Sequence, residues 1–206
     1  MEINEIINYL KRVEGMAKIG LSYTENPYDQ ERYEELKTST HDLLAQLTNF
    51  TPTAIAENFE KLDAYPTPKV DVRGLIIKEG KVLLIQEKVD RCWSMPGGWC
   101  DIGYSPKENV EKEVFEESGY MVQAVRLLTV WDKKYHNHPP ELAYVYKLNF
   151  LCDITGGSLK PGHEALNAEF FDINELPELS LPRNTKAQIQ KLYQLSLNKD
   201  EQTNFD

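Results

Sequence analysis

Three glutamates, Glu113, Glu116 and Glu117, have a spacing at which one helix face would carry all three carboxylates. At about 100° per residue they fall within roughly one 100° arc, at the edge of a face that continues inward as Val110 and Val114. Like charges at these spacings destabilise a helix by about 0.2 to 0.5 kcal/mol per pair unless a positive group lies among them. Carboxylate oxygens favour Mg²⁺ or Mn²⁺, which also bind phosphate oxygens. The cluster therefore indicates a metal site for phosphate chemistry, or else a solvated acidic helix face.

The flanking residues predict a short helix with defined ends. Ser105 is a favourable N-cap, Pro106 suits the first helical position, and Glu108 completes a Ser-x-x-Glu capping box. Gly119 is expected to end the helix. The three glutamates thus belong to one helix.

A glycine-rich loop precedes this helix. Pro96, Gly97 and Gly98 allow backbone conformations that a Cβ would forbid, so the chain can closely approach a ligand or the helix. An ordinary solvated helix does not need such a loop, and we therefore favour a site in which Gly97 and Gly98 contact the substrate.

The segment from Gly98 to Tyr120 resembles the Nudix box, the 23-residue loop-helix-loop motif of the Nudix hydrolases. The residues that match the motif are Gly98, Glu113, Val114, Glu116, Glu117 and Gly119. The resemblance implies that Glu113, Glu116 and Glu117 bind the metal ion.

Three positions depart from the motif. Tyr104 replaces its first glutamate, Lys112 replaces its arginine, and Tyr120 replaces its final aliphatic residue. The first change removes one potential metal ligand. Lysine keeps the charge of arginine but lacks the planar fork that holds a carboxylate in two directions, so Glu116 is expected to be less rigidly oriented.

Length and composition bound the kind of protein. The 206 residues, 41% of them hydrophobic, suffice for one domain of about 140 residues and a smaller one. With 33 acidic against 23 basic residues and no basic stripe, we expect neither nucleic acid nor a membrane surface as partner. Three cysteines without Cys-x-x-Cys spacing, and a start without signal-peptide features, predict a cytoplasmic protein.

The first 65 residues predict three amphipathic helices. One runs from about Ile3 to Gly20, a second follows an N-cap at Asp29, and a third opens at Pro52. The prolines of the segment 65–68 indicate a linker, which divides the chain into a helical N-terminal domain (1–65) and a second domain (66–206). So small a helical unit buries only about 60% of its unfolded surface, so we expect it to dock on the second domain or to form a homodimer.

Segment 20–37 is also similar to the helical N-terminal extension of one bacterial Nudix subgroup. Its members include pyrophosphatases that act on ADP-ribose and on CDP-choline. This resemblance makes these two compounds the leading substrates.

Hydrophobic patterns after the linker predict an α+β fold. Strands are expected at 70–77, 82–85, 122–131, 142–152 and 168–171, with a hairpin turn at 78–81 and a closing helix at 183–197. A mixed sheet between helices fits this order. The resemblance implies the same arrangement, the Nudix α/β/α sandwich.

Four further residues are candidates for the site. Arg73 lies among apolar strand residues and needs a partner, either substrate phosphate or Asp71. Glu164 lies in a loop where Nudix enzymes often carry an additional acid, although it can equally be an ordinary loop carboxylate. The aromatic rings of Trp93 and Tyr104 can stack on a base, but aromatic residues at such spacings more often belong to a core.

The resemblance implies a metal-dependent hydrolase of a nucleoside diphosphate linked to a second moiety. Mg²⁺ or Mn²⁺ held by the three glutamates would neutralise phosphate charge and lower the pKa of water. Glu116 then belongs to the catalytic set, and Glu117 or Glu164 takes the proton. The alternative is a catalytically weak nucleotide sensor, which Tyr104 and Lys112 favour. Trimming of RNA 5′ ends would need a basic channel that the composition does not indicate.

Overall fold

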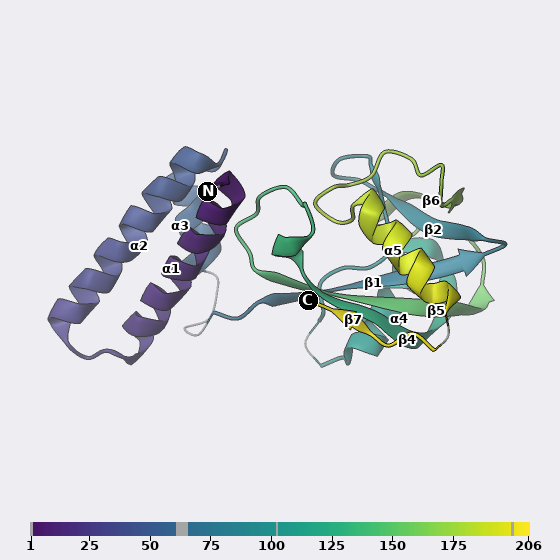
Figure 1. Ribbon diagram of the computed structural model, residues 1–206, viewed down its shortest axis with the longest axis horizontal. Helices are drawn as coiled ribbons and strands as arrows, with labels where there is room; N and C mark the ends of the chain where they lie inside the picture. Colours follow the sequence, from purple (N-terminus) through teal and green to yellow (C-terminus); the bar gives the residue numbers. More distant parts are fainter. Residues whose placement is uncertain (1, 61–65, 102, 199) are drawn as a thin grey trace. The chain divides into compact units, whose positions relative to one another are not determined.

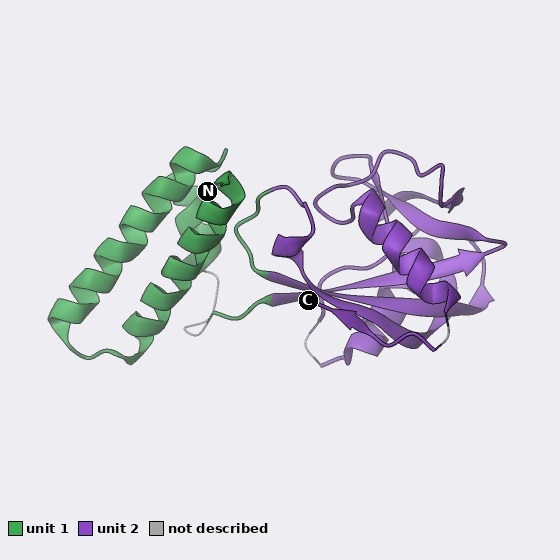
Figure 2. Ribbon diagram, in the orientation of Figure 1, with its two compact units in different colours: residues 1–68, 140–144 green, residues 69–139, 145–206 purple. Residues whose placement is uncertain are grey.

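The computed structural model describes residues 2–60, 66–101, 103–198 and 200–206. The chain divides into two compact units, one of residues 1–68 and 140–144 and the other of residues 69–139 and 145–206 (Figure 2). The predicted domain boundary lies between residues 65 and 66, and residue 65 lies outside the described residues, so the boundary stays a prediction.

The first unit contains the helices α1 (Ile3–Tyr23), α2 (Pro27–Leu47) and α3 (Pro52–Glu60). Segment 140–144 belongs to this unit, and its leucine is buried with the helices. This explains why the strand predicted from residue 142 begins only at Val145. The buried core of the unit consists of Ile7, Leu10, Leu44, Ile55, Phe59 and Leu142.

Two predicted helix ends in this unit are wrong. α1 continues past Gly20, where a Cβ would lie 2.4 Å from Cζ of Tyr33, so this glycine permits close packing and does not end the helix. α2 begins at Pro27 and not after Asp29, because Asn26 Oδ1 accepts a hydrogen bond of 2.9 Å from the amide of Tyr28. The pair Asn-Pro is therefore an N-cap followed by a first-position proline.

The second unit is built on a mixed, seven-stranded sheet with the order β3-β2-β1-β5-β4-β7, in which β6 also pairs with β2. β1 runs parallel to β5, and β5 is antiparallel to β4. The strands are β1 (Lys69–Lys78), β2 (Lys81–Glu87), β3 (Trp93–Ser94), β4 (Tyr120–Asp132), β5 (Val145–Gly157), β6 (Ala165–Asp172) and β7 (Asn204–Phe205).

Helices α4 (Pro106–Ser118) and α5 (Lys186–Leu197) lie on opposite faces of this sheet (Figure 1). Alternate residues of β1 reach the two layers: Val72 is buried with Val110 of α4, whereas Leu75 is buried with Ile189 of α5. The predicted α+β class, with a mixed sheet between helices and a helical region before it, is confirmed.

The hairpin between β1 and β2 also forms as predicted. Lys78 pairs with Lys81, and the two central residues, Glu79 and Gly80, have φ angles of 52° and 76°. Positive φ at both positions is the geometry that matches the twist of the flanking strands. The closing helix, in contrast, starts three residues later than predicted, because Thr185 caps it.

Candidate active site

The helix that carries the glutamates forms with the predicted ends. Ser105 Oγ accepts from the amide of Glu108 (3.2 Å), and the Glu108 carboxylate accepts from the amide of Ser105 (2.8 Å). Gly119 ends the helix at φ 77°. Because Val110 and Val114 are fully buried against the sheet, the glutamates lie at the edge of the buried helix face.

The glycine loop is hydrogen bonded to β1. The amide of Val72 donates to the carbonyl of Gly98 and the amide of Gly74 to the carbonyl of Pro96, each at 2.9 Å. Gly97 has φ 138°, and a Cβ there would lie 2.0 Å from the carbonyl oxygen of Val72, so only glycine fits. The loop therefore runs alongside β1, with an antiparallel bridge between Asp71 and Trp99.

The carboxylates of Glu113 and Glu117 meet this loop. The amide of Gly97 donates to Glu117 Oε2 at 2.7 Å. A Cβ on Gly98 would lie 3.0 Å from Glu113 Oε2, so the absence of a side chain leaves room for this carboxylate. The structure thus brings together four of the residues predicted for the site.

Burial controls the charge of Glu117. The residue is 6% exposed, and burial raises the pKa of its carboxyl group to about 8, although the Arg73 cation and the Gly97 amide act in the opposite direction. The pKa of Glu113 is also raised by burial, with Lys112 opposing and the carboxylates of Glu116 and Glu164 adding to the rise. Both carboxylates would be stabilised in their ionised form by a nearby cation.

Glu116 is the most accessible of the three glutamates. Its carboxylate pairs with Lys112 at 3.0 Å, and the same ammonium group lies 3.2 Å from Asp101. Within the described ranges, no three acid, histidine or cysteine side chains are already arranged as a metal site, because Glu116 turns to Lys112 and Glu117 to Gly97. The three carboxylates nevertheless offer the oxygen donors that a hard divalent cation prefers, and a cation would offset the burial that raises the pKa of Glu113 and Glu117.

Arg73 finds its partner within the protein. The side chain is buried, and Nε and Nη2 donate to the two carboxylate oxygens of Asp71 at 3.2 and 2.9 Å. Nη1 donates to the carbonyl of Met95 at 3.0 Å, and Lys147 also pairs with Asp71. Of the two alternatives for Arg73, the structure shows the ion pair with Asp71.

The remaining predicted residues lie in different surroundings. The Trp93 ring packs edge-on against Phe171, with centroids 4.7 Å apart, in the core beneath α5. Tyr104 is 53% exposed in the loop before α4. Glu164 is exposed in the loop before β6. The amide of Gly162 in this loop donates a hydrogen bond of 3.3 Å to the carbonyl of Glu117. Glu164 is close enough to Glu113 to add to the rise of its pKa, whereas the Trp93 ring contributes to the core.

The sequence did not predict a second group of polar residues, whose hydrogen bonds and ion pair lie next to the glycine loop. Glu87, buried at the end of β2, accepts from Ser94 Oγ at 2.7 Å, pairs with Arg183, and contributes to the raised pKa of Glu117. Asn184 Oδ1 accepts from the amide of Met95 at 3.0 Å. No local pattern marks these residues, because the contacts join segments far apart in the chain.

Comparison with known proteins places the chain in a family. The NUDIX domain model matches residues 67–195, and the model of a UDP-X-like, N-terminal oligomerisation domain matches residues 4–59. The chain belongs to the Nudix hydrolases. This confirms the resemblance of the box, and Nudix hydrolases generally use divalent metal ions.

Several known proteins are similar to this chain over part or all of its length. This Nudix hydrolase is 41% identical to YjhB of Bacillus subtilis over 196 residues, which cover 95% of this chain and 94% of YjhB. An ADP-ribose pyrophosphatase from Streptococcus suis is 42% identical, with a TM-score of 0.62 over 68% of this chain and 100% of its own. A UDP-X diphosphatase is 33% identical, with a TM-score of 0.64 over the whole of both chains.

In the described ranges, no helix is long and apolar enough to cross a bilayer.

Proposed function

We propose that this Nudix hydrolase cleaves the pyrophosphate bond of a nucleoside diphosphate linked to a second moiety, with ADP-ribose as the leading substrate. The observation that carries the proposal is the placement of Glu113 and Glu117 against the backbone of Gly97 and Gly98. The 42% identity to an ADP-ribose pyrophosphatase supports the choice of substrate.

Two other substrates have separate support. The UDP-X diphosphatase matches the whole chain, and the N-terminal helices match a UDP-X-like domain, which favours UDP-linked compounds. The proposal of CDP-choline as a substrate rests only on the similarity of segment 20–37 to the N-terminal extension of the bacterial Nudix subgroup.

In the proposed reaction, Glu113, Glu116 and Glu117 would hold Mg²⁺ or Mn²⁺, which when bound neutralises charge on the phosphates and lowers the pKa of a water. The Gly97 amide fixes Oε2 of Glu117 and thereby orients its second oxygen. Glu117 or Glu164 takes the proton of the water that attacks one phosphorus, while the other phosphate leaves. Neither Trp93 nor Arg73 needs to contact the substrate for these steps.

We further propose that residues 1–65 form an N-terminal domain through which the chain forms a homodimer, and that residues 66–206 form the hydrolase domain. The two family models, which match residues 4–59 and 67–195, support this division. Cys92, Cys100 and Cys152 are free thiols, which is common in the reducing cytoplasm and supports a cytoplasmic location.

The test is product release from ADP-ribose, CDP-choline and UDP-glucose with Mg²⁺ or Mn²⁺, and with EDTA as control. We expect metal-dependent formation of a nucleoside monophosphate, concentrated on one compound, and loss of this activity in Glu117→Gln. Tight binding of one compound without turnover would contradict the proposal that the chain is an enzyme. It would favour the nucleotide sensor, for which Tyr104 and Lys112 are the supporting residues.

A further inference from the structure

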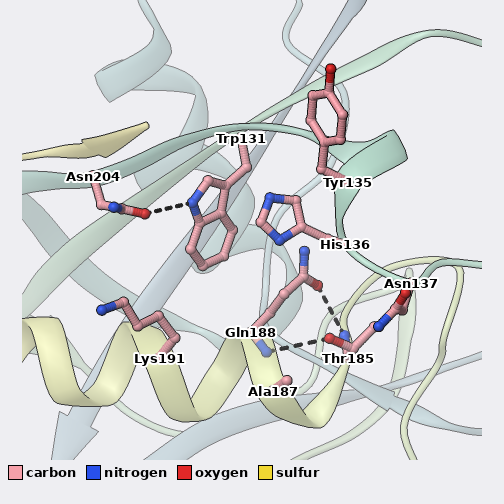
Figure 3. Close-up of a pocket in the computed structure, with 9 residues that line it drawn as sticks. All are labelled: Trp131, Tyr135, His136, Asn137, Thr185, Ala187, Gln188, Lys191 and Asn204. Carbon is pink, nitrogen blue, oxygen red and sulfur yellow. Dashed lines mark hydrogen bonds between the residues drawn. The ribbon is translucent and has the colours of Figure 1, made fainter. Parts of the chain in front are cut away.

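A cavity of about 330 Å³ lies on the α5 side of the sheet, the face opposite to that covered by α4. Its walls are formed by the end of β4, the 3₁₀ turn η1 (Lys133–Tyr135), the strand β7 and the first turns of α5 (Figure 3). The lining residues that matter below are Trp131, Tyr135, His136, Thr185, Gln188 and Lys191. All of them belong to the second unit, and none belongs to the glutamate site.

One buried polar group of this cavity has no hydrogen-bond partner in the part of the chain that the structure describes. Gln188 is 3% exposed, and its Oε1 accepts from the amide of Thr185 at 3.0 Å, which fixes the orientation of the side-chain amide. Its Nε2 is buried and makes no hydrogen bond among the described residues. Figure 3 shows this nitrogen pointing into the space beside the rings of Trp131 and His136. A buried donor of this kind calls for an acceptor.

The surroundings of this donor favour a negative ligand. Gln188 lies in the first turn of the 12-residue helix α5, whose N-terminus carries partial positive charge, and Lys191 follows one turn later with its side chain at the exposed rim. Asp206, an acid that contacts the lining residue His136, is already bound to the ring of His136 (3.0 Å) and to the amide of Asp132 (2.8 Å). The indole N–H of Trp131 is likewise engaged by Asn204.

We propose that this cavity binds a phosphate monoester, with a phosphate oxygen accepting from Gln188 Nε2 and with Lys191 and the α5 N-terminus supplying positive charge. Its volume lies at the lower end of the range of small-molecule sites, about 300 to 1,000 Å³, so an organic group also fits, beside the exposed ring of Tyr135. A nucleoside monophosphate carries this phosphate group and is a product of the proposed hydrolysis. The choice of a nucleoside monophosphate as the probe rests on the proposed function, whereas the phosphate site itself does not.

The experiment is calorimetric titration of the full chain with AMP and with inorganic phosphate in EDTA, so that metal-dependent binding at the glutamates does not contribute. Gln188→Glu keeps an oxygen for the Thr185 amide, since Ser/Thr-x-x-Glu is itself a capping box, but replaces the donor by a carboxylate. Gln190→Glu makes the same change on the same helix outside the cavity lining. Lys191→Gln removes the rim charge while leaving the cap intact.

We expect one metal-independent site for AMP, an affinity lowered by about tenfold or more in Gln188→Glu, and no change in Gln190→Glu. Lys191→Gln should weaken binding in the same direction, which provides a second test if Gln188→Glu does not fold. Failure of the unsubstituted protein to bind AMP in EDTA, or equal binding by the variants Gln188→Glu and Gln190→Glu, would overturn the proposal. Because the titration requires no turnover, its result is independent of whether ADP-ribose is cleaved.

Discussion

At the scale of single residues, Glu117 combines two requirements that oppose each other. Its carboxylate is held at 2.7 Å by the Gly97 amide, which favours the ionised form, whereas the burial of its side chain favours the neutral form. A metal ligand must be ionised. A divalent cation would therefore reduce the pKa of Glu117, and metal binding and deprotonation are expected to be coupled.

This coupling predicts how stability depends on pH. With a pKa of 4.5 when unfolded and about 8 when folded, Glu117 contributes stability below pH 4.5 that is lost as the pH rises through 8, because folding then buries a charge. In EDTA the unfolding temperature should therefore fall between pH 5 and 9, and Glu117→Gln should reduce this fall. Mg²⁺ should stabilise the protein more at pH 9 than at pH 6. Equal pH profiles for both proteins would contradict the assignment.

A second residue-scale prediction separates the roles of Glu117 and Glu164. Loss of a general base typically lowers the rate by about 10² to 10⁴. If Glu164, exposed in its loop, is the base, Glu164→Gln should lower kcat at saturating Mg²⁺ and leave the half-saturating Mg²⁺ concentration unchanged. Glu117→Gln should in any case raise that concentration, because it removes a ligand. Kinetics against Mg²⁺ concentration distinguish the two, and changes below tenfold in both variants would exclude both as the base.

At the scale of elements, the sequence predicted what depends on local signals. The capping box at Ser105, the positive-φ turn at Gly80 and the apolar periodicities predicted helices and strands that the structure contains, although several of the predicted ends are wrong. The short strands β3 and β7 were missed, since two residues carry no periodicity. The contact between Asn184 and Met95, which supports the glycine loop, depends on tertiary structure and has no local signature.

The glycine loop is the element whose geometry can be tested most directly. Gly97→Ala would place a Cβ at 2.0 Å from the carbonyl of Val72, so the loop must leave β1 and the Glu117 carboxylate loses its amide donor. We expect a loss of activity of about 10²-fold or more, as a displacement of about 1 Å can cause, together with a lower unfolding temperature. Gly103→Ala is the matched control, because φ is also positive (96°) there but no heavy atom lies within 4 Å of the added Cβ. Equal effects of the two changes would show that backbone strain alone matters.

At the scale of the whole molecule, the helical unit leaves apolar surface exposed. Its core rests on few buried residues, and apolar side chains of α1 and α2 remain exposed, among them Tyr9, Met16, Leu36 and Leu43. Such surfaces on a small unit favour association with another surface. The match to an N-terminal oligomerisation domain favours a second copy of the chain as that surface.

This assignment predicts a change in mass on substitution of two leucines of α2. Leu36 and Leu43 are spaced i, i+7, so they lie on one helix face, and they are 41% and 39% exposed. We expect the unsubstituted protein to be a dimer by light scattering and the double variant Leu36→Asp, Leu43→Asp to be a monomer with an unchanged circular dichroism spectrum. Leu159→Asp, at a position 40% exposed in the second unit, should remain a dimer. A monomeric unsubstituted protein, or a dimeric double variant, would show that α2 does not provide the interface, since two buried charges per chain would not be tolerated there.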